Sequence, residues 1–123
     1  MSYDFNNDIP IYLQIIEHIK LQIINKTYLP NQKIPSVRDL SVLYEVNPNT
    51  VQKALTELET MGLIFTESTN GKFVTNNQTI IDNIKKQTTT EMIDNFLESI
   101  KELGINKADI IDLLTKKENL WIY

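Results

Sequence analysis

The fold is decided by two stretches of the sequence, IPSVRDL at residues 34–40 and VNPNTVQKA at residues 46–54. Each contains a residue whose side-chain oxygen suits the N-terminal cap of a helix, Ser36 in the first and Asn47 in the second. Pro48 follows Asn47 at the first helical position, where a missing backbone N–H leaves no hydrogen bond unmade. The two stretches therefore predict two helices that are separated by a short turn.

These two helices have the arrangement of a helix-turn-helix. The first is expected to end near Tyr44, and the second to run over residues 47–61 and to be closed by Gly62. One face of the second helix is apolar and predicts core packing, with Val51, Ala54, Leu55, Leu58 and Met61 at helical spacing. Its opening residues are polar, as in a helix that enters the major groove of DNA.

The flanking sequence completes a winged helix-turn-helix over residues 1–76. Upstream, Pro10 begins a helix that extends to about Asn25, with an apolar stripe of Tyr12, Ile15, Ile16, Ile19 and Ile23. Downstream, residues 63–75 place apolar runs on both sides of Asn70-Gly71, which is a strong signal for a β-hairpin. The predicted fold is mostly α with one small β-hairpin, the wing.

Residues 77–123 are predicted to form a short helical dimerisation segment. Helical spacing returns at about Thr79 and stops at Gly104, and the weak helix formers at residues 88–90 leave open a kink or a junction between two helices. Asn106 caps a last short helix. Two such helices cannot enclose a core, so we expect a second copy of the chain to cover their apolar residues. The residues expected at this dimer interface are Met92, Ile93, Phe96, Leu97, Ile100, Leu103, Ile110, Leu113 and Leu114. Trp121 and Tyr123 are expected to dock on the body of the protein or on a partner.

Composition and charge narrow the class of protein. The 123 residues include no Cys and a single His, and no grouping of residues suggests an enzyme, a metal site or a cofactor. No apolar stretch is long enough to span a membrane, so we expect a cytoplasmic protein. The net charge of −4 opposes indiscriminate binding to nucleic acid. Residues 19–56, however, hold five basic and two acidic side chains, so the acidic excess lies outside the predicted helix-turn-helix.

The two opening stretches, together with LETMGLI at residues 58–64 and the wing ending GKFV at residues 71–74, resemble the GntR family of bacterial transcriptional regulators. The VNPNTV motif and the short helical tail are similar to those of the YtrA subfamily, whose members lack the large effector-binding domain of other GntR proteins. The sequence departs from the family at Lys26 and Asn31, where glycine is common, and in a wing with fewer glycines. Because Asn tolerates positive φ, the turns at Asn31 and Asn70 are expected to survive.

The resemblance implies that the helix-turn-helix contacts DNA, including through the arginine that corresponds to Arg38. The candidate DNA-binding residues are Ser36, Arg38, Asn47, Asn49, Thr50, Gln52, Lys53, Gly71 and Lys72. Thr56, Tyr12 and Lys20 are weaker candidates. Other roles stay open: Asn47 also caps its helix, and Arg38 has acidic neighbours in Asp39 and Glu45 with which it can pair. His18 is expected at the surface or the boundary of the core.

Two functions of different classes follow. The first is a sequence-specific regulator, a dimeric repressor that binds a palindromic double-stranded DNA operator through helix 47–61 and wing 63–75. The second is a winged-helix module for protein interaction without specific DNA binding, which the acidic composition favours. The sequence identifies no small-molecule effector.

Overall fold

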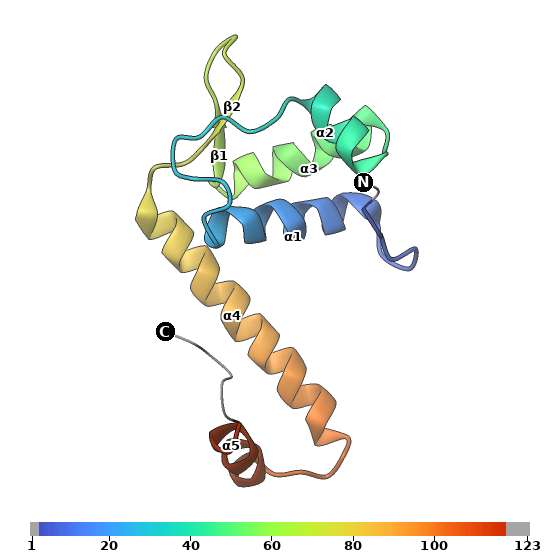
Figure 1. Cartoon of the computed structure of the whole chain (residues 1–123), viewed down its shortest axis with the longest axis vertical. Helices are drawn as coiled ribbons and strands as arrows, with labels where there is room; N and C mark the ends of the chain where they lie inside the picture. Colours follow the sequence, from blue (N-terminus) through green and yellow to red (C-terminus); the bar gives the residue numbers. More distant parts are fainter. Residues whose placement is uncertain (1–2, 118–123) are drawn as a thin grey trace. The chain divides into compact units, whose positions relative to one another are not determined.

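The structure is a computed structural model that describes residues 3–117. It consists of five helices and one hairpin in those residues: α1 (Ile11–Ile24), α2 (Val37–Tyr44), α3 (Pro48–Thr60), β1 (Ile64–Thr66), β2 (Lys72–Val74), α4 (Gln78–Lys101) and α5 (Lys107–Thr115). The chain divides into two compact units on either side of the bond between Lys85 and Lys86, within α4. The order of elements confirms the predicted winged helix-turn-helix fold class (Figure 1).

Local capping fixes the starts of the helices as the sequence predicts. The Ser36 hydroxyl accepts a hydrogen bond from the backbone N–H of Asp39 at 3.1 Å, and the Asn47 side-chain oxygen accepts one from the N–H of Asn49 at 2.8 Å. Between α2 and α3 the chain turns at Glu45, which has a φ of +56°. The turn of the helix-turn-helix therefore occupies the three residues from Glu45 to the cap Asn47.

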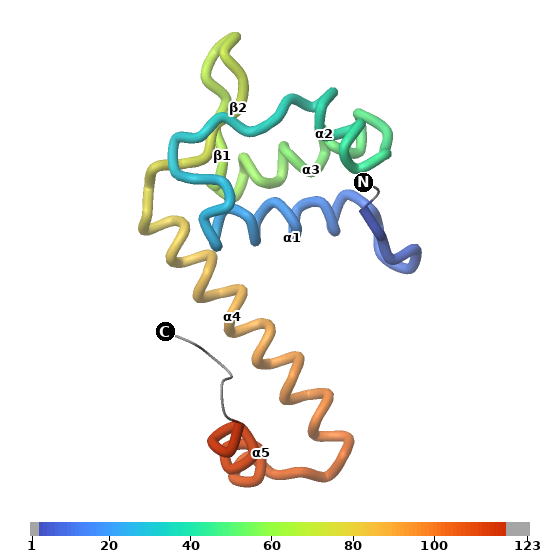
Figure 2. Tube along the Cα trace, viewed as in Figure 1, coloured from blue at the N-terminus to red at the C-terminus, as the bar shows by residue number. Residues whose placement is uncertain are grey.

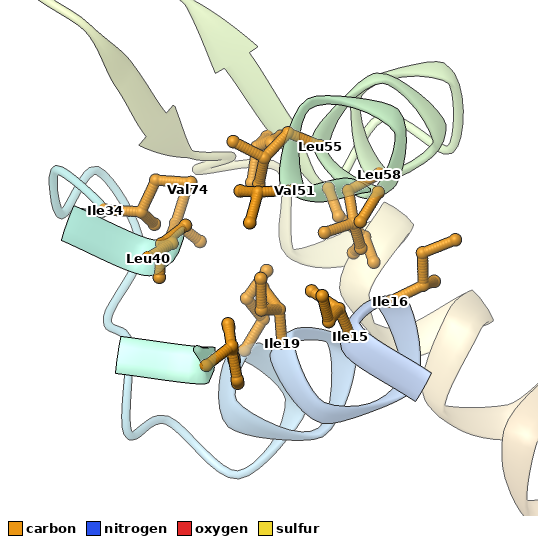
Figure 3. Packing of buried hydrophobic residues seen from close by; sticks show 14 of the residues in the cluster. Ile15, Ile16, Ile19, Ile34, Leu40, Val51, Leu55, Leu58 and Val74 are labelled. Carbon is orange, nitrogen blue, oxygen red and sulfur yellow. The ribbon is translucent and has the colours of Figure 1, made fainter. Parts of the chain in front are cut away.

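The core of the first unit lies between α1 and α3. Ile15 and Ile19 of α1 face Val51, Leu55 and Leu58 of α3, and all five are at most 1% exposed (Figure 3). Ile34, Leu40 and Val74 bring the loop before α2, α2 itself and the hairpin into the same cluster. This packing buries one face of α3 and leaves the opposite face exposed.

The hairpin is joined to the segment between α1 and α2 (Figure 2). Its two strands are antiparallel, with Ile64 opposite Val74 and Thr66 opposite Lys72. The N–H of Ile34 donates to the carbonyl of Lys72 and the N–H of Val74 to the carbonyl of Gln32, both at 2.9 Å. The loop before α2 therefore pairs with β2 and holds the hairpin beside the start of α2.

α4 is continuous through the three threonines at residues 88–90, where the sequence left a kink open. Each Thr costs only a few tenths of a kcal/mol in a helix, which is too little to break a helix of this length. Asn77 caps the helix, because its side-chain oxygen accepts from the N–H of Thr79 at 3.1 Å. No helix in residues 3–117 is both long and apolar enough to cross a membrane.

The residues at the two positions where the family commonly has glycine, Lys26 and Asn31, adopt the left-handed conformation. Lys26, just after α1, has a φ of +67°, and Asn31 also has a φ of +67°. The expectation for Asn31 is confirmed. The turn at Asn70 also survives, but its left-handed residues are Ser68 and Gly71, with φ of +48° and +109°. The positive φ values lie two residues before Asn70 and one residue after it, so Asn70 itself needs no positive φ.

Candidate nucleic-acid interface

The start of α2 exposes Ser36 and Arg38. Ser36 is occupied as the helix cap, and the backbone N–H groups of the first helical turn have no partner within the helix. The guanidinium of Arg38 makes no hydrogen bond or ion pair with any residue from 3 to 117. Its alternative role as the partner of Asp39 or Glu45 is therefore not seen, and its five donors are available to an anion.

The first two turns of α3 present a row of polar side chains. Asn47, Asn49, Gln52 and Lys53 are exposed and Thr50 is half-buried. The side-chain amide of Gln52 donates to the Thr56 hydroxyl at 3.3 Å, which leaves its carbonyl oxygen open. Because Val51, Ala54 and Leu55 are buried on the other side of the helix, these polar groups share the outward face. That face has the donors and acceptors that read base edges.

Lys53 is held by an aromatic ring of α1. Its Nζ lies 3.9 Å from the centre of the Tyr12 ring, a cation–π contact. Asn49, Thr50 and Lys53 line a shallow hollow of about 410 Å³ together with Ile11 and Tyr12. Lys20, which the sequence also offered from the first helix, is buried, and its Nζ lies 2.8 Å from the Glu17 carboxylate. Tyr12 thus lies beside the candidate residues of α3, whereas the ammonium group of Lys20 is neutralised within α1.

Lys72 in the hairpin has internal partners. Its Nζ donates to the Thr66 hydroxyl at 2.7 Å and lies 3.5 Å from the carboxylate of Glu59, near the end of α3. The Thr66 hydroxyl in turn donates to the same carboxylate in a short contact. This hydrogen bond, and secondly the charge of Lys72, hold the pKa of Glu59 below its ordinary value against the opposing effect of desolvation. Lys72, a candidate DNA contact in the sequence, is therefore part of a network with Glu59.

A groove between the hairpin and the start of α2 contains a basic residue that sequence reasoning missed. This wing groove has a volume of about 320 Å³ and is lined by Lys33, Ser36, Asn70, Gly71 and Lys72 among others. The side chain of Lys33 crosses Gly71 so closely that a Cβ there would lie 2.9 Å from its Cε. The signal for Lys33 is the backbone pairing of its loop with β2, which no local pattern in the sequence reveals.

In the second unit the predicted interface residues are mostly exposed. Met92, Ile93, Phe96, Leu97, Leu103, Leu113 and Leu114 are each between 37% and 71% exposed, whereas Ile110 is 7% exposed. Phe96, Ile100, Ile110, Leu113 and Leu114 line an apolar groove of about 260 Å³ between the C-terminal part of α4 and α5. Trp121 and Tyr123 lie outside the described residues.

The geometry agrees with a comparison to known families. A family model described as bacterial regulatory proteins, gntR family, matches residues 11–74, from the start of α1 to the end of β2. The chain belongs to this family. As a GntR protein it is a DNA-binding transcriptional regulator and not an enzyme.

Two relatives in Bacillus subtilis extend the comparison. The chain is 36% identical over 112 residues to the uncharacterised HTH-type transcriptional regulator YhcF, which covers 91% of this chain and 93% of YhcF. It is 39% identical over 77 residues to the HTH-type transcriptional repressor YtrA, covering 63% of this chain and 59% of YtrA. These similarities agree with a YtrA-like GntR regulator.

Solved structures support the same conclusion for the fold. A GntR family transcriptional regulator from Listeria monocytogenes matches 93% of this chain and 100% of its own, with a TM-score of 0.86 and 37% identity. The DNA-binding domain of AraR, solved in complex with an operator, matches 60% of this chain and 94% of its own, with a TM-score of 0.55 and 29% identity. The second match covers a part of the chain about as long as the winged helix-turn-helix.

Proposed function

We propose that this GntR regulator is a dimeric repressor that binds a two-fold symmetric operator. In each half-site the N-terminal turns of α3 enter the major groove, and the start of α2 and the hairpin contact the flanking phosphates. The observation that carries the proposal is the outward face of α3, on which Asn49, Gln52 and Lys53 are exposed beside the unpaired Arg38. The operator complex of the AraR domain favours this role over a module for protein interaction.

Each candidate residue has chemistry that suits the proposed contact. The amides of Asn49 and Gln52 can pair with adenine, and Lys53 can pair with guanine, at about 1–3 kcal/mol of discrimination for each good bidentate pair. Arg38 and the backbone N–H groups at the start of α2 suit phosphate oxygens. Asn47 keeps its amide nitrogen for DNA while its oxygen caps α3. Thr50 and Ser36 offer hydroxyl groups at the same surface, and Gly71, which has no side chain, lets the backbone approach DNA closely.

The dimer is supported by the second unit. Its exposed apolar side chains have no partner large enough among residues 86–117 to cover them, and a second copy of the same segment supplies a matching apolar surface. Two copies related by a two-fold axis would present two α3 helices to two half-sites, which is why a palindromic operator is expected. The repressor role is supported by the name of the relative YtrA. Because bacterial DNA lies in the cytoplasm, operator binding implies that the protein acts there.

The experiment is selection of the preferred DNA from a random pool, followed by a salt titration of binding to that sequence. We expect a palindromic site, and an observed affinity that falls with salt at a slope of about −0.9 for each phosphate neutralised. Equal binding to the selected and a scrambled duplex at every salt concentration would contradict the proposal. A reporter gene under the selected site should be transcribed less when the protein is present.

Two variants test the surface. Arg38→Ala and Lys53→Ala should each weaken binding by roughly 5- to 150-fold, the equivalent of about 1–3 kcal/mol, with helix content unchanged. Lys86→Ala is the matched control, because it also removes one positive charge but lies on α4 outside the first unit. If Lys86→Ala weakened binding as much as the other two, net charge and not the α2–α3 surface would control affinity.

A further inference from the structure

Two lysines flank Gly71 in the wing groove, and they differ in their partners. Lys33 is exposed, and its ammonium group makes no ion pair or hydrogen bond with residues 3–117. Lys72 has a side chain that is only 19% exposed, and its Nζ contacts both Thr66 and Glu59. One cation of the groove is therefore available to an external anion, and the other is already neutralised inside the protein.

The partner of Lys72 is an exposed carboxylate with its own supports. Glu59 lies in the last turn of α3, on the side that meets the hairpin, and its side chain is 36% exposed. It accepts from the Thr66 hydroxyl, and this bond together with Lys72 keeps its pKa low, so it stays ionised at neutral pH. The carboxylate offers Lys72 what a DNA phosphate would offer, an anionic oxygen within ion-pair distance, here 3.5 Å from Nζ.

We propose that Glu59 restrains DNA binding by occupying Lys72 as an internal substitute for phosphate. For the hairpin to add Lys72 to the DNA contact, the ammonium group must exchange the Glu59 carboxylate for a backbone phosphate across the wing groove. Glu59 is thus a positioning residue that acts through Lys72 and lowers both affinity and the number of phosphates neutralised. The inference rests on the proposed function, because it assigns a further residue to the same DNA surface.

The exchange breaks only a weak internal pair. The Lys72–Glu59 pair is partly exposed, so solvent screens it and it contributes little to stability. A phosphate contact also releases counterions from DNA, which the internal pair does not. The restraint is therefore weak enough to be broken at a DNA surface and strong enough to keep Lys72 turned inward in the free protein.

The first experiment needs no DNA. Lysines of the whole protein are acetylated with a limiting reagent, and the rates at Lys33 and Lys72 are compared by mass spectrometry. We expect Lys72 to react several-fold more slowly than Lys33 in the wild type, and Glu59→Gln to raise the rate at Lys72 but not at Lys33. An unchanged rate at Lys72 would overturn the inference, whether or not the proposed operator binding is correct.

The second experiment measures the salt dependence of binding to the selected DNA. Glu59→Gln should strengthen binding and make the slope steeper by about 0.9, the value for one additional phosphate. Glu57→Gln, which removes the same charge two residues away on α3, should leave the slope unchanged. Lys72→Met should abolish the effect, so that Glu59→Gln adds nothing in the Lys72→Met protein.

The outcomes separate the two proposals. A wild type that binds a palindrome, combined with a Glu59→Gln slope equal to that of the wild type, would reject the restraint and keep the proposed function. A gain of equal size in the Lys72→Met protein would show a general charge effect and also reject the restraint. Weaker binding by folded Glu59→Gln would mean that Glu59 orients Lys72 toward DNA, which is the opposite of the proposal. Circular dichroism of each variant confirms the fold.

Discussion

The winged helix-turn-helix and the second unit, whose residues 86–117 are called the tail below, contain similar apolar side chains but bury them to different extents. In the first unit Ile15, Leu55 and Leu58 are fully buried against one another. In the tail Phe96 and Leu113 are 45% and 55% exposed although they lie at the same helical spacing. An apolar stripe by itself therefore does not say whether its partner is in the same chain. The first unit supplies its own partner, whereas the tail is expected to find one in a second copy.

The largest expected effect is in the first unit. Leu58→Ala removes a fully buried side chain of α3 that packs against α1, and it should lower the free energy of unfolding by about 2–5 kcal/mol through lost burial and the cavity left behind. Urea denaturation followed by circular dichroism measures it. Leu113→Ala in the exposed part of α5 is the matched control in a monomeric background. Equal losses for the two leucines would remove the distinction between the regions.

The next effect is in the tail. Phe96→Asp places a charge in the apolar groove between α4 and α5, and burial of an unpaired carboxylate in the proposed dimer interface should weaken dimerisation by about 30-fold or more. Sedimentation at several protein concentrations measures the dissociation constant. Asn95→Asp adds the same charge at the neighbouring exposed position and should change it little. A Phe96→Asp protein that stays dimeric would place the dimer contact elsewhere.

The sequence predicted the elements whose signals are local. Asn47, Pro48 and Gly62 mark the two ends of α3 within a short stretch, and capping and backbone geometry at those residues are the same in the structure. The hairpin follows in the same way from apolar runs on either side of a turn. Elements of this kind need only their own residues to specify them, so a single sequence is enough.

The contacts of the candidate site were harder to predict, because they join residues that are distant in the sequence. Glu59 meets Lys72 beside the Thr66–Lys72 pair of the hairpin, and Tyr12 lies under Lys53. Neither pair has a periodic or motif-like signature. Lys20 was wrongly expected to be available for DNA for the same reason. Its position on a helix does not reveal that its side chain is buried beside Glu17.

Gly62 and Gly104 have similar backbone conformations but different surroundings. Gly62 and Gly104 have φ of +80° and +73°, but a Cβ at Gly62 would lie 3.4 Å from Ile80 Cδ1, whereas a Cβ at Gly104 would meet nothing within 4 Å. In the Phe96→Asp background, Gly62→Ala should lower the unfolding free energy of the first unit by about 1–2 kcal/mol, the cost of a left-handed alanine. Gly104→Ala should leave that transition in place. A shift of the same size with both variants would mean that the two regions unfold as one.

The smallest effect is a pH dependence that belongs to the first unit alone. His18 is the only histidine of the chain, and its Nδ1 lies 2.6 Å from the hydroxyl oxygen of Tyr44. Burial raises the pKa of Tyr44, so the phenol keeps its proton throughout the neutral range. Burial also lowers the pKa of His18 from 6.5. The folded state therefore binds this proton less readily than the unfolded chain does.

The sign follows from that difference in proton affinity. The contribution of His18 to stability is complete above pH 6.5 and is lost as the pH falls through the lower pKa of the folded state. Urea denaturation at pH 7.5 and 5.5 should show a smaller unfolding free energy at the lower pH, and His18→Gln should reduce this difference. The dimerisation constant should be the same at both pH values, because the only histidine of the sequence is His18 in the first unit. If the dimer dissociated at pH 5.5 and His18→Gln behaved like the wild type, the pH-sensitive contact would lie in the tail and not in the first unit.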